Sequence, residues 1–472
     1  MARLTREPVG VRGVAVRAVL FKGTRDLLPI YALYGVLFAE NGLSTAQISL
    51  LLAIWSVTSF VLEVPSGAWA DTVSRRGLLV LSCVLQAACF AGWMLVPTFA
   101  GFALGFLLWG IAGALESGTF EALIYDDLVA RGEPSAYASI MGWARGAQEG
   151  TVLVAILAAA PLFAWGGYPL VGWVSVGIGV LHTLTALALP SAPKAISATA
   201  VDDLDDEPNP STLGPHIVPG SAPNATNDRA HSRRPTGGEL GSTPTDAAAD
   251  QPQPVESDDG GIVRGASSSR YVIMLRTGLA EALRVRRVRR GVLLGALLYG
   301  ITAFDEYFGL LAVSGGASTS TSALLVGVTV VGSLVGSLLA GRTEVLSART
   351  LAIALFTAGI LFIAGALAVG VDADPALLWI GFLGIGLAYG IDFNVEVVAD
   401  ARLQAAIEGP ARATVTSVSG LLSEIVALAV FGFVAAATVW LSMSVTIALL
   451  GVVLLVTAAL VPSWLPPRHD EG

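Results

Sequence analysis

The sequence predicts an all-α membrane protein with twelve transmembrane helices arranged as two pseudo-symmetric six-helix bundles. The first observation is composition: 54% of the 472 residues are hydrophobic, 13% are charged, and the mean hydropathy is +0.71. A soluble fold cannot bury so much apolar surface, whereas most apolar runs here reach the roughly 20 residues that span a bilayer. The second observation is the alternation of basic loops, and the third is an internal repeat.

Six apolar runs come before residue 190 and six come after residue 291. Lys22, Arg25 and Asp26 interrupt the first of them. The predicted spans are 16–38, 45–68, 78–97, 101–124, 136–160 and 168–190, followed by 291–312, 321–341, 350–370, 377–399, 413–437 and 440–461.

The two sets of spans define a bundle over 1–190 and a bundle over 291–472. Between them, 191–269 is acidic and rich in Pro, Ser, Thr, Asp and Ala, so its few large apolar residues cannot offset the entropy of ordering. It is predicted to be a disordered cytoplasmic linker. The segment 270–290 interleaves seven arginines with apolar residues, which predicts a basic amphipathic helix on an anionic membrane surface.

Basic residues alternate between the loops. Arg75, Arg76, Arg342 and Arg349 lie in loops on one predicted side, whereas the opposite loops, such as 39–44, contain neither Lys nor Arg. The positive-inside rule then places both termini and the linker in the cytoplasm, with the chain crossing the membrane many times. No cleavage site for a signal peptide follows the N-terminus, so the first span is expected to act as an uncleaved signal.

The two halves resemble each other in sequence. Glu116 of the fourth span recurs as Asp392 of the tenth, at an offset of 276 residues. An even number of spans in each half gives parallel repeats about an axis along the membrane normal. At the same offset, Gly105-Phe106-Leu107 recurs as Gly381-Phe382-Leu383, Gly110 as Gly386 and Pro134 as Pro410.

The loop after the second span carries a recognisable signature. It resembles the Gly-x-Leu-Ala-Asp-Arg-x-Gly-Arg-Lys/Arg loop of the major facilitator superfamily, and the Glu-x-Pro-Ser-Gly that begins at Glu63 resembles a bacterial subgroup. Trp69, Thr72 and Ser74 depart from the pattern. The matching residues are Gly67, Ala70, Asp71, Arg75 and Arg76.

This resemblance implies the twelve-helix fold of that family, secondary transport by alternating access and a location in the bacterial inner (plasma) membrane. It also implies that the loop locks the outward-facing state, with Asp71 pairing with Arg75, Arg76 or a neighbouring helix end, while Gly67 permits close helix approach. The alternative is a basic loop that only sets the topology. The family further places spans one, four, seven and ten around a central cavity.

Ionisable residues inside the bilayer are the candidate site, because each costs about 2.5–3.5 kcal/mol on insertion scales. They fall on the four spans that should line the cavity. The candidate substrate and proton residues are Asp26, Glu116, Glu121, Asp305, Glu306, Asp392 and Glu396.

Four further charged residues are expected to support the site: Glu63, Arg145, Glu149 and Glu424. Arg145 is expected to pair with Glu116 or Glu149. The acids of the second half have no basic residue within its spans, and burial without a cation favours the protonated form. Such carboxyl groups suit proton coupling and recognition of a cationic solute. The alternative for several of them is a structural or interfacial role, including snorkelling of Asp26.

These observations predict proton-coupled efflux of a small organic solute. Proton-driven nutrient uptake and a non-transporting sensor or scaffold that docks through the linker are the alternatives. A Walker loop, a zinc-ligand cluster and a nucleophile elbow are missing from the sequence, so an enzyme, a cofactor and a metal are not expected. The expected partners are the solute, protons and bilayer lipids, with no nucleic acid, and the protein is expected to be monomeric.

Overall fold

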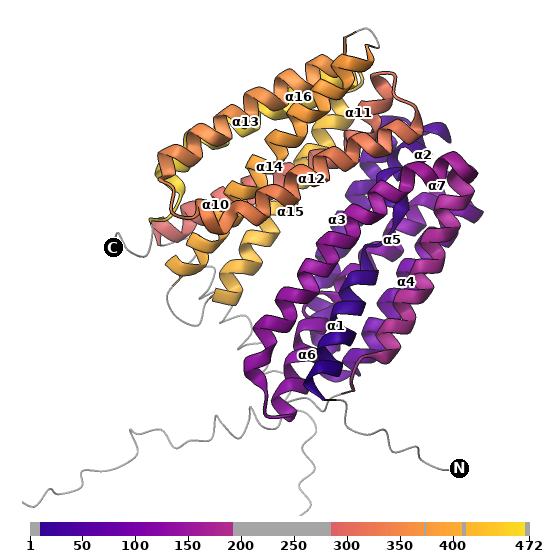
Figure 1. The fold of residues 1–472 in the computed structure, drawn as a ribbon, viewed down its shortest axis with the longest axis vertical. Helices are drawn as coiled ribbons and strands as arrows, with labels where there is room; N and C mark the ends of the chain where they lie inside the picture. The colour runs from indigo at the N-terminus through magenta and orange to yellow at the C-terminus, as the bar shows by residue number, and fades with distance from the viewer. Residues whose placement is uncertain (1–9, 192–284, 372–373, 408–411, 468–472) are drawn as a thin grey trace, which may run out of the picture. The chain divides into compact units, whose positions relative to one another are not determined.

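A computed structural model describes residues 10–191, 285–371, 374–407 and 412–467, and the regular structure within these ranges is entirely helical (Figure 1). The predicted linker over 191–269 lies outside the described residues, apart from Ser191. Only the end of the predicted amphipathic segment 270–290 is described, and there Arg286–Arg290 form the first turn of a membrane helix.

The first half contains seven α-helices. They are α1 (Val11–Arg25), α2 (Tyr34–Glu40), α3 (Thr45–Thr72), α4 (Arg75–Leu95), α5 (Phe99–Glu116), α6 (Thr119–Ala130) and α7 (Tyr137–Ala188), with short 3₁₀ helices η1 (Pro29–Ala32) and η2 (Pro134–Ala136). Ser44 begins α3 with a capping box, because its side chain accepts from the backbone of Gln47 while the Gln47 side chain accepts from the backbone of Ser44.

The second half repeats this order. Its helices are α10 (Arg286–Ile301), η4 (Thr302–Tyr307), α11 (Phe308–Ser314), α12 (Thr319–Thr343), α13 (Ala348–Val369), α14 (Pro375–Ala406), α15 (Arg412–Ala437) and α16 (Met443–Trp464). The hydroxyls of Ser318, Ser347 and Ser442 cap the first turns of α12, α13 and α16.

The described residues contain the twelve predicted spans. Ten stretches are long and apolar enough to cross a membrane. One of these, 134–188, is two spans, since α7 is non-helical at Gly166 and Gly167, and Gly167 has a φ of +60°. The first predicted span is the twelfth, and its two α-helical pieces are each too short to be counted.

Three spans predicted to be continuous are interrupted. The first is α1, η1 and α2, because Pro29 has no backbone N–H to continue the helix. The fourth breaks between α5 and α6 at Gly118, whose φ of +69° leaves the helical region. The seventh passes from α10 through η4 to α11. Adding 276 to the bounds of η1 gives 305–308, so the breaks in the first and seventh spans correspond.

Close packing of helices follows the same repeat. In α12, a Cβ at Gly332 or Gly336 would collide with the carbonyl of Gly386 or Gly390 in α14. Gly110 of α5 corresponds to Gly386, and a Cβ there would lie 2.8 Å from Thr58 Cβ and 2.9 Å from the Trp55 carbonyl oxygen of α3. Glycines four apart allow this approach of helix backbones. The parallel repeat predicted from the sequence is therefore visible in the packing.

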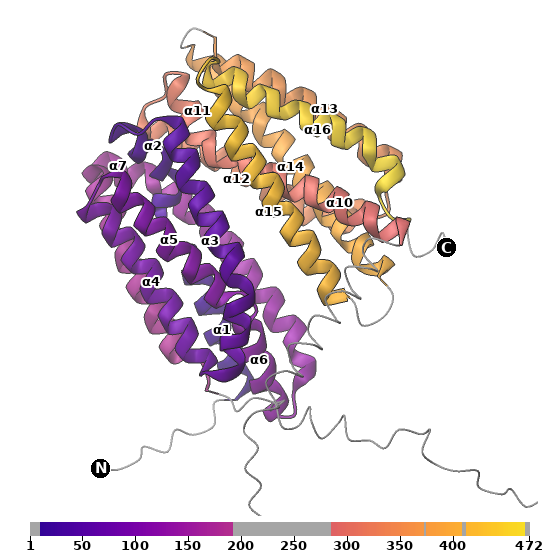
Figure 2. The ribbon, with the colours of Figure 1, turned by 180° about the vertical axis from the view of Figure 1, so that it is seen from behind.

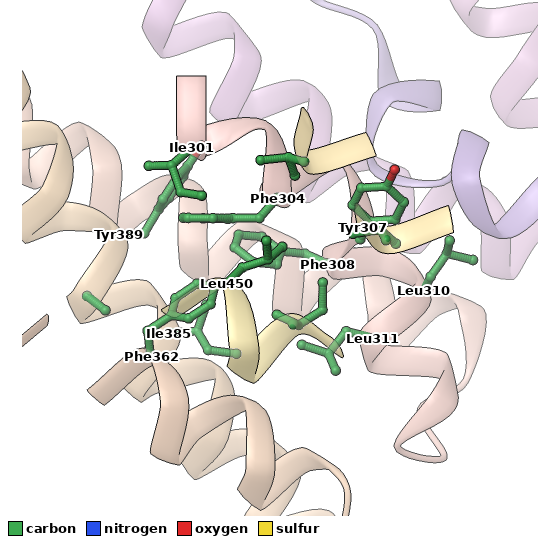
Figure 3. Close-up of a cluster of buried hydrophobic side chains, with 14 of the residues drawn as sticks. Ile301, Phe304, Tyr307, Phe308, Leu310, Leu311, Phe362, Ile385, Tyr389 and Leu450 are labelled. Carbon is green, nitrogen blue, oxygen red and sulfur yellow. The ribbon is translucent and has the colours of Figure 1, made fainter. Parts of the chain in front are cut away.

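Aromatic side chains surround the break in each half. Figure 3 shows Phe304, Tyr307 and Phe308 of η4 and α11 among Phe362 and Tyr389, and the Phe304 and Phe362 rings are 4.5 Å apart. Both halves belong to one compact unit, in which α3 contacts α15 and α7 contacts α12. Figure 2 shows both halves from behind. The aromatic packing holds each break at a defined place in the core. In the first half, the corresponding cluster comprises Tyr34, Phe38, Trp93, Phe106 and Trp109.

Candidate functional site

The carboxylate of Glu116 is the centre of a buried ionic cluster in the first half. Lys22 Nζ lies 2.9 Å from its Oε1, and Arg25 Nε lies 2.6 Å from its Oε2. Each oxygen therefore has its own cation, although Glu116 is only 5% exposed. The Lys22 ammonium also lies 3.6 Å from Glu121 Oε1. The cluster satisfies a buried carboxylate by pairing, which sustains its ionised form.

Asp26 extends this cluster at the break in the first span. Its Oδ2 accepts hydrogen bonds from Arg25 Nη1 at 3.1 Å and from Gln148 Nε2 at 2.5 Å. Its Oδ1 accepts from the Tyr31 hydroxyl at 3.1 Å. Asp26 is thus buried and held by three side chains from α1, η1 and α7.

Local folding explains why the cluster forms here. Lys22 and Arg25 stand three residues apart in the last turn of α1, so they share one face and lie at the negative end of the helix dipole. Glu116 ends α5, and the turn at Gly118 separates it from Glu121 in the first turn of α6. Two helix ends therefore deliver the opposite charges to one place.

Two cavities adjoin the cluster, and Lys22 and Glu121 line both. The smaller, of about 410 Å³, also has Arg25 and Glu116 in its wall. The larger, of about 580 Å³, has Arg145 and Glu149 in its wall, together with Met141, Gly142 and Gln148. Both volumes are within the range of small-molecule sites, and each wall carries both signs of charge.

Arg145 does not pair as the sequence suggested. Glu116 is occupied by Lys22 and Arg25, and within the described residues Arg145 makes no ion pair with Glu149 either. Arg145 instead stands exposed in the larger cavity. The predicted pair of Arg145 and Glu116 rested on their similar depth in neighbouring helices, whereas Lys22 and Arg25 of α1 lie closer to Glu116.

The acids of the second half have a different environment. Asp392 of α14 is fully buried, and neither carboxylate oxygen has a hydrogen-bond partner within the described residues. The Oε2 atom of Glu396, one turn further along α14, is also buried without a hydrogen-bond partner within the described residues. Among the residues described, no Lys or Arg pairs with either carboxyl group.

Asp305 and Glu306 lie in η4, the break of the seventh span. Asp305 Oδ2 accepts a hydrogen bond of 2.5 Å from the Tyr389 hydroxyl, which links η4 to α14. Glu306 is half-buried and makes no ion pair in the described part of the chain. The structure therefore brings Asp305 to the helix that carries Asp392 and Glu396.

The other supporting residues do not form the expected ion pairs. Glu424 of α15 accepts a short hydrogen bond from the Ser56 hydroxyl of α3, which joins the two halves. Glu63, near the end of α3, is exposed, and neither acid pairs with a cation within the described ranges. A second bond between the halves links the hydroxyls of Ser49 and Tyr307 at 2.7 Å.

The loop signature is only partly described, because the Asp71 side chain lies outside the described part. Arg75 Nη1 forms a short ion pair with Asp126 of α6, and Arg76 Nη1 donates to the Leu189 carbonyl at 3.4 Å. A Cβ at Gly67 would meet open space, so the expected close helix approach is not found there. Nearby, the hydrogen bond from Arg131 to Asp127 raises the pKa of the Arg131 guanidinium.

Sequence reasoning missed Lys22 as a partner of Glu116 and Tyr389 as a donor to Asp305. The spacing of Lys22 and Arg25 on one helical face was the available signal for the first. No signal in the sequence pointed to Tyr389, because a Tyr within an apolar span is usually part of the hydrophobic core.

Residues 24–395 match the family model of the Major Facilitator Superfamily. No curated protein sequence matches the chain. Similar solved structures include nucleoside transporter NupG, at 12% identity and a TM-score of 0.54, with 95% of each chain covered. A mutant of NupG is 11% identical at a TM-score of 0.60, covering 95% of this chain and 98% of that one. A POT family transporter in complex with a thioalcohol-conjugated peptide is 14% identical at a TM-score of 0.57, covering 96% of this chain and 94% of that one.

At such identities the solved structures show a shared fold and nothing finer. The family match covers most of the chain, including the breaks in the first and seventh spans and Asp392 of α14, and it ends one residue before Glu396. The chain therefore belongs to the Major Facilitator Superfamily and is a multi-pass membrane transporter, not an enzyme.

Proposed function

We propose that the chain is a proton-coupled transporter of a small organic solute that works by alternating access. The observation that carries this proposal is Asp392, which is wholly buried with neither oxygen hydrogen-bonded in the described part of the chain. An ionised carboxylate in such a place would be uncompensated, so the group is neutral while it is buried. When the helices around it move and admit water, it can release the proton.

Asp305, Glu306 and Glu396 support a proton route near Asp392. Asp305 is linked to α14 through Tyr389, and Glu396 lies one helical turn from Asp392. The 3₁₀ break in η4 interrupts the regular helix beside these groups, and such breaks often mark functional sites. We assign the proton to this group of acids in the second half.

The solute site is proposed in the cavities of the first half. The larger cavity offers Glu149 for a cationic group of the solute, while Lys22, Arg145 and Gln148 offer donors for its polar groups. NupG is named a nucleoside transporter, and the POT family structure holds a peptide conjugate. These names support a polar organic solute of similar size.

Export is the direction that the acidic residues favour if a cationic solute and the proton compete for one carboxylate, because exclusive binding couples opposite movements. A specific observation favours uptake as the second candidate. The unpaired acids and the two cavities lie in different halves, so a proton and a solute can be bound together. Joint binding couples movement in the same direction.

Flux measurements on the purified full chain in vesicles test both the coupling and its direction. Nucleosides, short peptides and organic cations serve as probe solutes, each under a pH gradient of either sign. Asp392→Asn and Asp305→Asn should abolish accumulation driven by pH while leaving solute exchange without a gradient. Glu344→Gln is the matched control, because it removes an exposed acid of the second half. Unchanged pH-driven flux in both Asn variants would refute proton coupling through these groups.

A further inference from the structure

A third cavity, of about 430 Å³, lies far from the acids in the sequence. Its wall consists of Arg286, Arg287 and Arg290 together with residues 463–467. No carboxylate is among the lining residues, and within the described chain none of the three arginines forms an ion pair. The described wall of the cavity therefore concentrates three positive charges.

The start of α10 and the end of α16 build this cavity. Arg290 Nη1 donates to the Ser463 carbonyl at 3.1 Å. A Cβ at Gly291 would lie 3.1 Å from Pro466 Cγ and 2.9 Å from Leu403 Cδ1, so the backbone of α10 is closely packed there. The arginines thus project from a fixed framework and not from a loop.

The position of the cavity relative to the bilayer follows from the spans. Arg286 begins one candidate span and Trp464 ends another, so the cavity lies where two membrane helices meet the aqueous boundary. Trp is enriched at that boundary. The three arginines and Trp464 therefore stand at the ends of two candidate spans, on the side that the positive-inside rule assigns to the cytoplasm.

We propose that this cavity binds the phosphate of an anionic phospholipid. A guanidinium group matches a phosphate with two parallel hydrogen bonds, and three of them form a pocket that a zwitterionic head group would neutralise less well. The acyl chains of a lipid would remain beside the apolar surfaces of α10 and α16, whereas a soluble phosphate has no such contact. The site is separate from the proposed solute and proton route.

Native mass spectrometry of the detergent-solubilised full chain tests this site with phosphatidylglycerol and phosphatidylcholine as probes. The parent should retain phosphatidylglycerol in preference to phosphatidylcholine. The double variant Arg286→Gln/Arg287→Gln should bind phosphatidylglycerol roughly tenfold more weakly, as expected for two lost charge-assisted contacts. The double variant Arg342→Gln/Arg349→Gln removes the same charge from exposed arginines elsewhere and should bind like the parent.

Three outcomes would overturn the proposal. Equal weakening in both double variants would indicate a general effect of surface charge. Displacement of phosphatidylglycerol by millimolar inorganic phosphate would indicate a site for a soluble anion. Equal retention of the two lipids by the parent would also refute it, and this last measurement needs no variant, so it holds even if Arg286→Gln/Arg287→Gln does not fold.

Discussion

The two halves of this transporter carry acids at corresponding positions of corresponding helices, but the surroundings of the two acids differ. Glu116 and Asp392 occupy corresponding positions of the repeat, and both are buried. Glu116 has a cation on each oxygen, whereas Asp392 has no partner in the described part of the chain. The repeat therefore fixes where an acid stands, while its neighbours decide whether it has a counter-ion.

The difference comes from the first helix of each half. The end of α1 supplies Lys22 and Arg25, whereas at the offset of 276 residues the end of α10 supplies the buried Leu298 and Ile301. Cations in one half and apolar side chains in the other give the two acids separate tasks. We expect Glu116 to stabilise and shape the solute cavities and Asp392 to carry the proton.

The largest effect on stability should come from removing both cations of Glu116. Lys22→Met/Arg25→Met leaves a buried carboxylate unpaired, which costs about 3–5 kcal/mol. Thermal unfolding in detergent measures the loss. Adding Glu116→Gln should recover much of it, because the uncompensated charge is then gone. A triple variant as unstable as the double would show that packing of the two long side chains matters more than their charge.

The second-largest loss of stability is expected from substitutions at the closely packed glycines. Gly336→Ala places a methyl group against the Gly390 carbonyl, where backbone meets backbone, and overpacking of this kind costs about 1–3 kcal/mol. Gly110→Ala meets the movable Thr58 side chain as well as the Trp55 carbonyl, so the cost should be smaller. Thermal unfolding of the two single variants compares them. Equal losses would contradict the tighter packing of the second half.

Two tyrosines allow a finer comparison. Tyr389→Phe removes the side-chain donor that the structure gives Asp305 and should cost about 1 kcal/mol. Tyr31→Phe removes one donor to Asp26 and the acceptor of a 3.3 Å hydrogen bond from Gln86 Nε2, but it should cost less, because Arg25 and Gln148 still donate to Asp26. Both substitutions keep the ring packing, so unfolding reports the lost hydrogen bonds. A larger loss for Tyr31→Phe would mean that the cluster in the first half depends on its hydroxyl.

The smallest change in stability is expected for Asp392→Asn. A neutral acid without hydrogen bonds is replaced by a neutral amide of the same shape, so the free energy of unfolding should change by less than about 1 kcal/mol. Glu116→Gln takes the nearer carboxylate from Lys22 and Arg25, which keep only Glu121 at 3.6 Å and Asp26 at 3.1 Å among the described residues, and should cost more. Unfolding of Asp392→Asn beside Glu116→Gln measures the contrast. Equal costs would argue that Asp392 is ionised and paired in the native protein.

The sequence by itself determined the span order, the parallel repeat and the positions of the acids, because a bilayer demands long apolar runs and makes every interruption by charge visible. It did not reveal that the helices of the first and seventh spans are interrupted, since most residues of η1 and η4 are apolar and continue the apolar runs on either side. Only the tertiary structure decided that Lys22 and Arg25, not Arg145, pair with Glu116, and that Asp392 has no partner among the described residues. Such pairings depend on which helix faces meet and how far each side chain reaches, and neither is written in the spacing of residues along one helix.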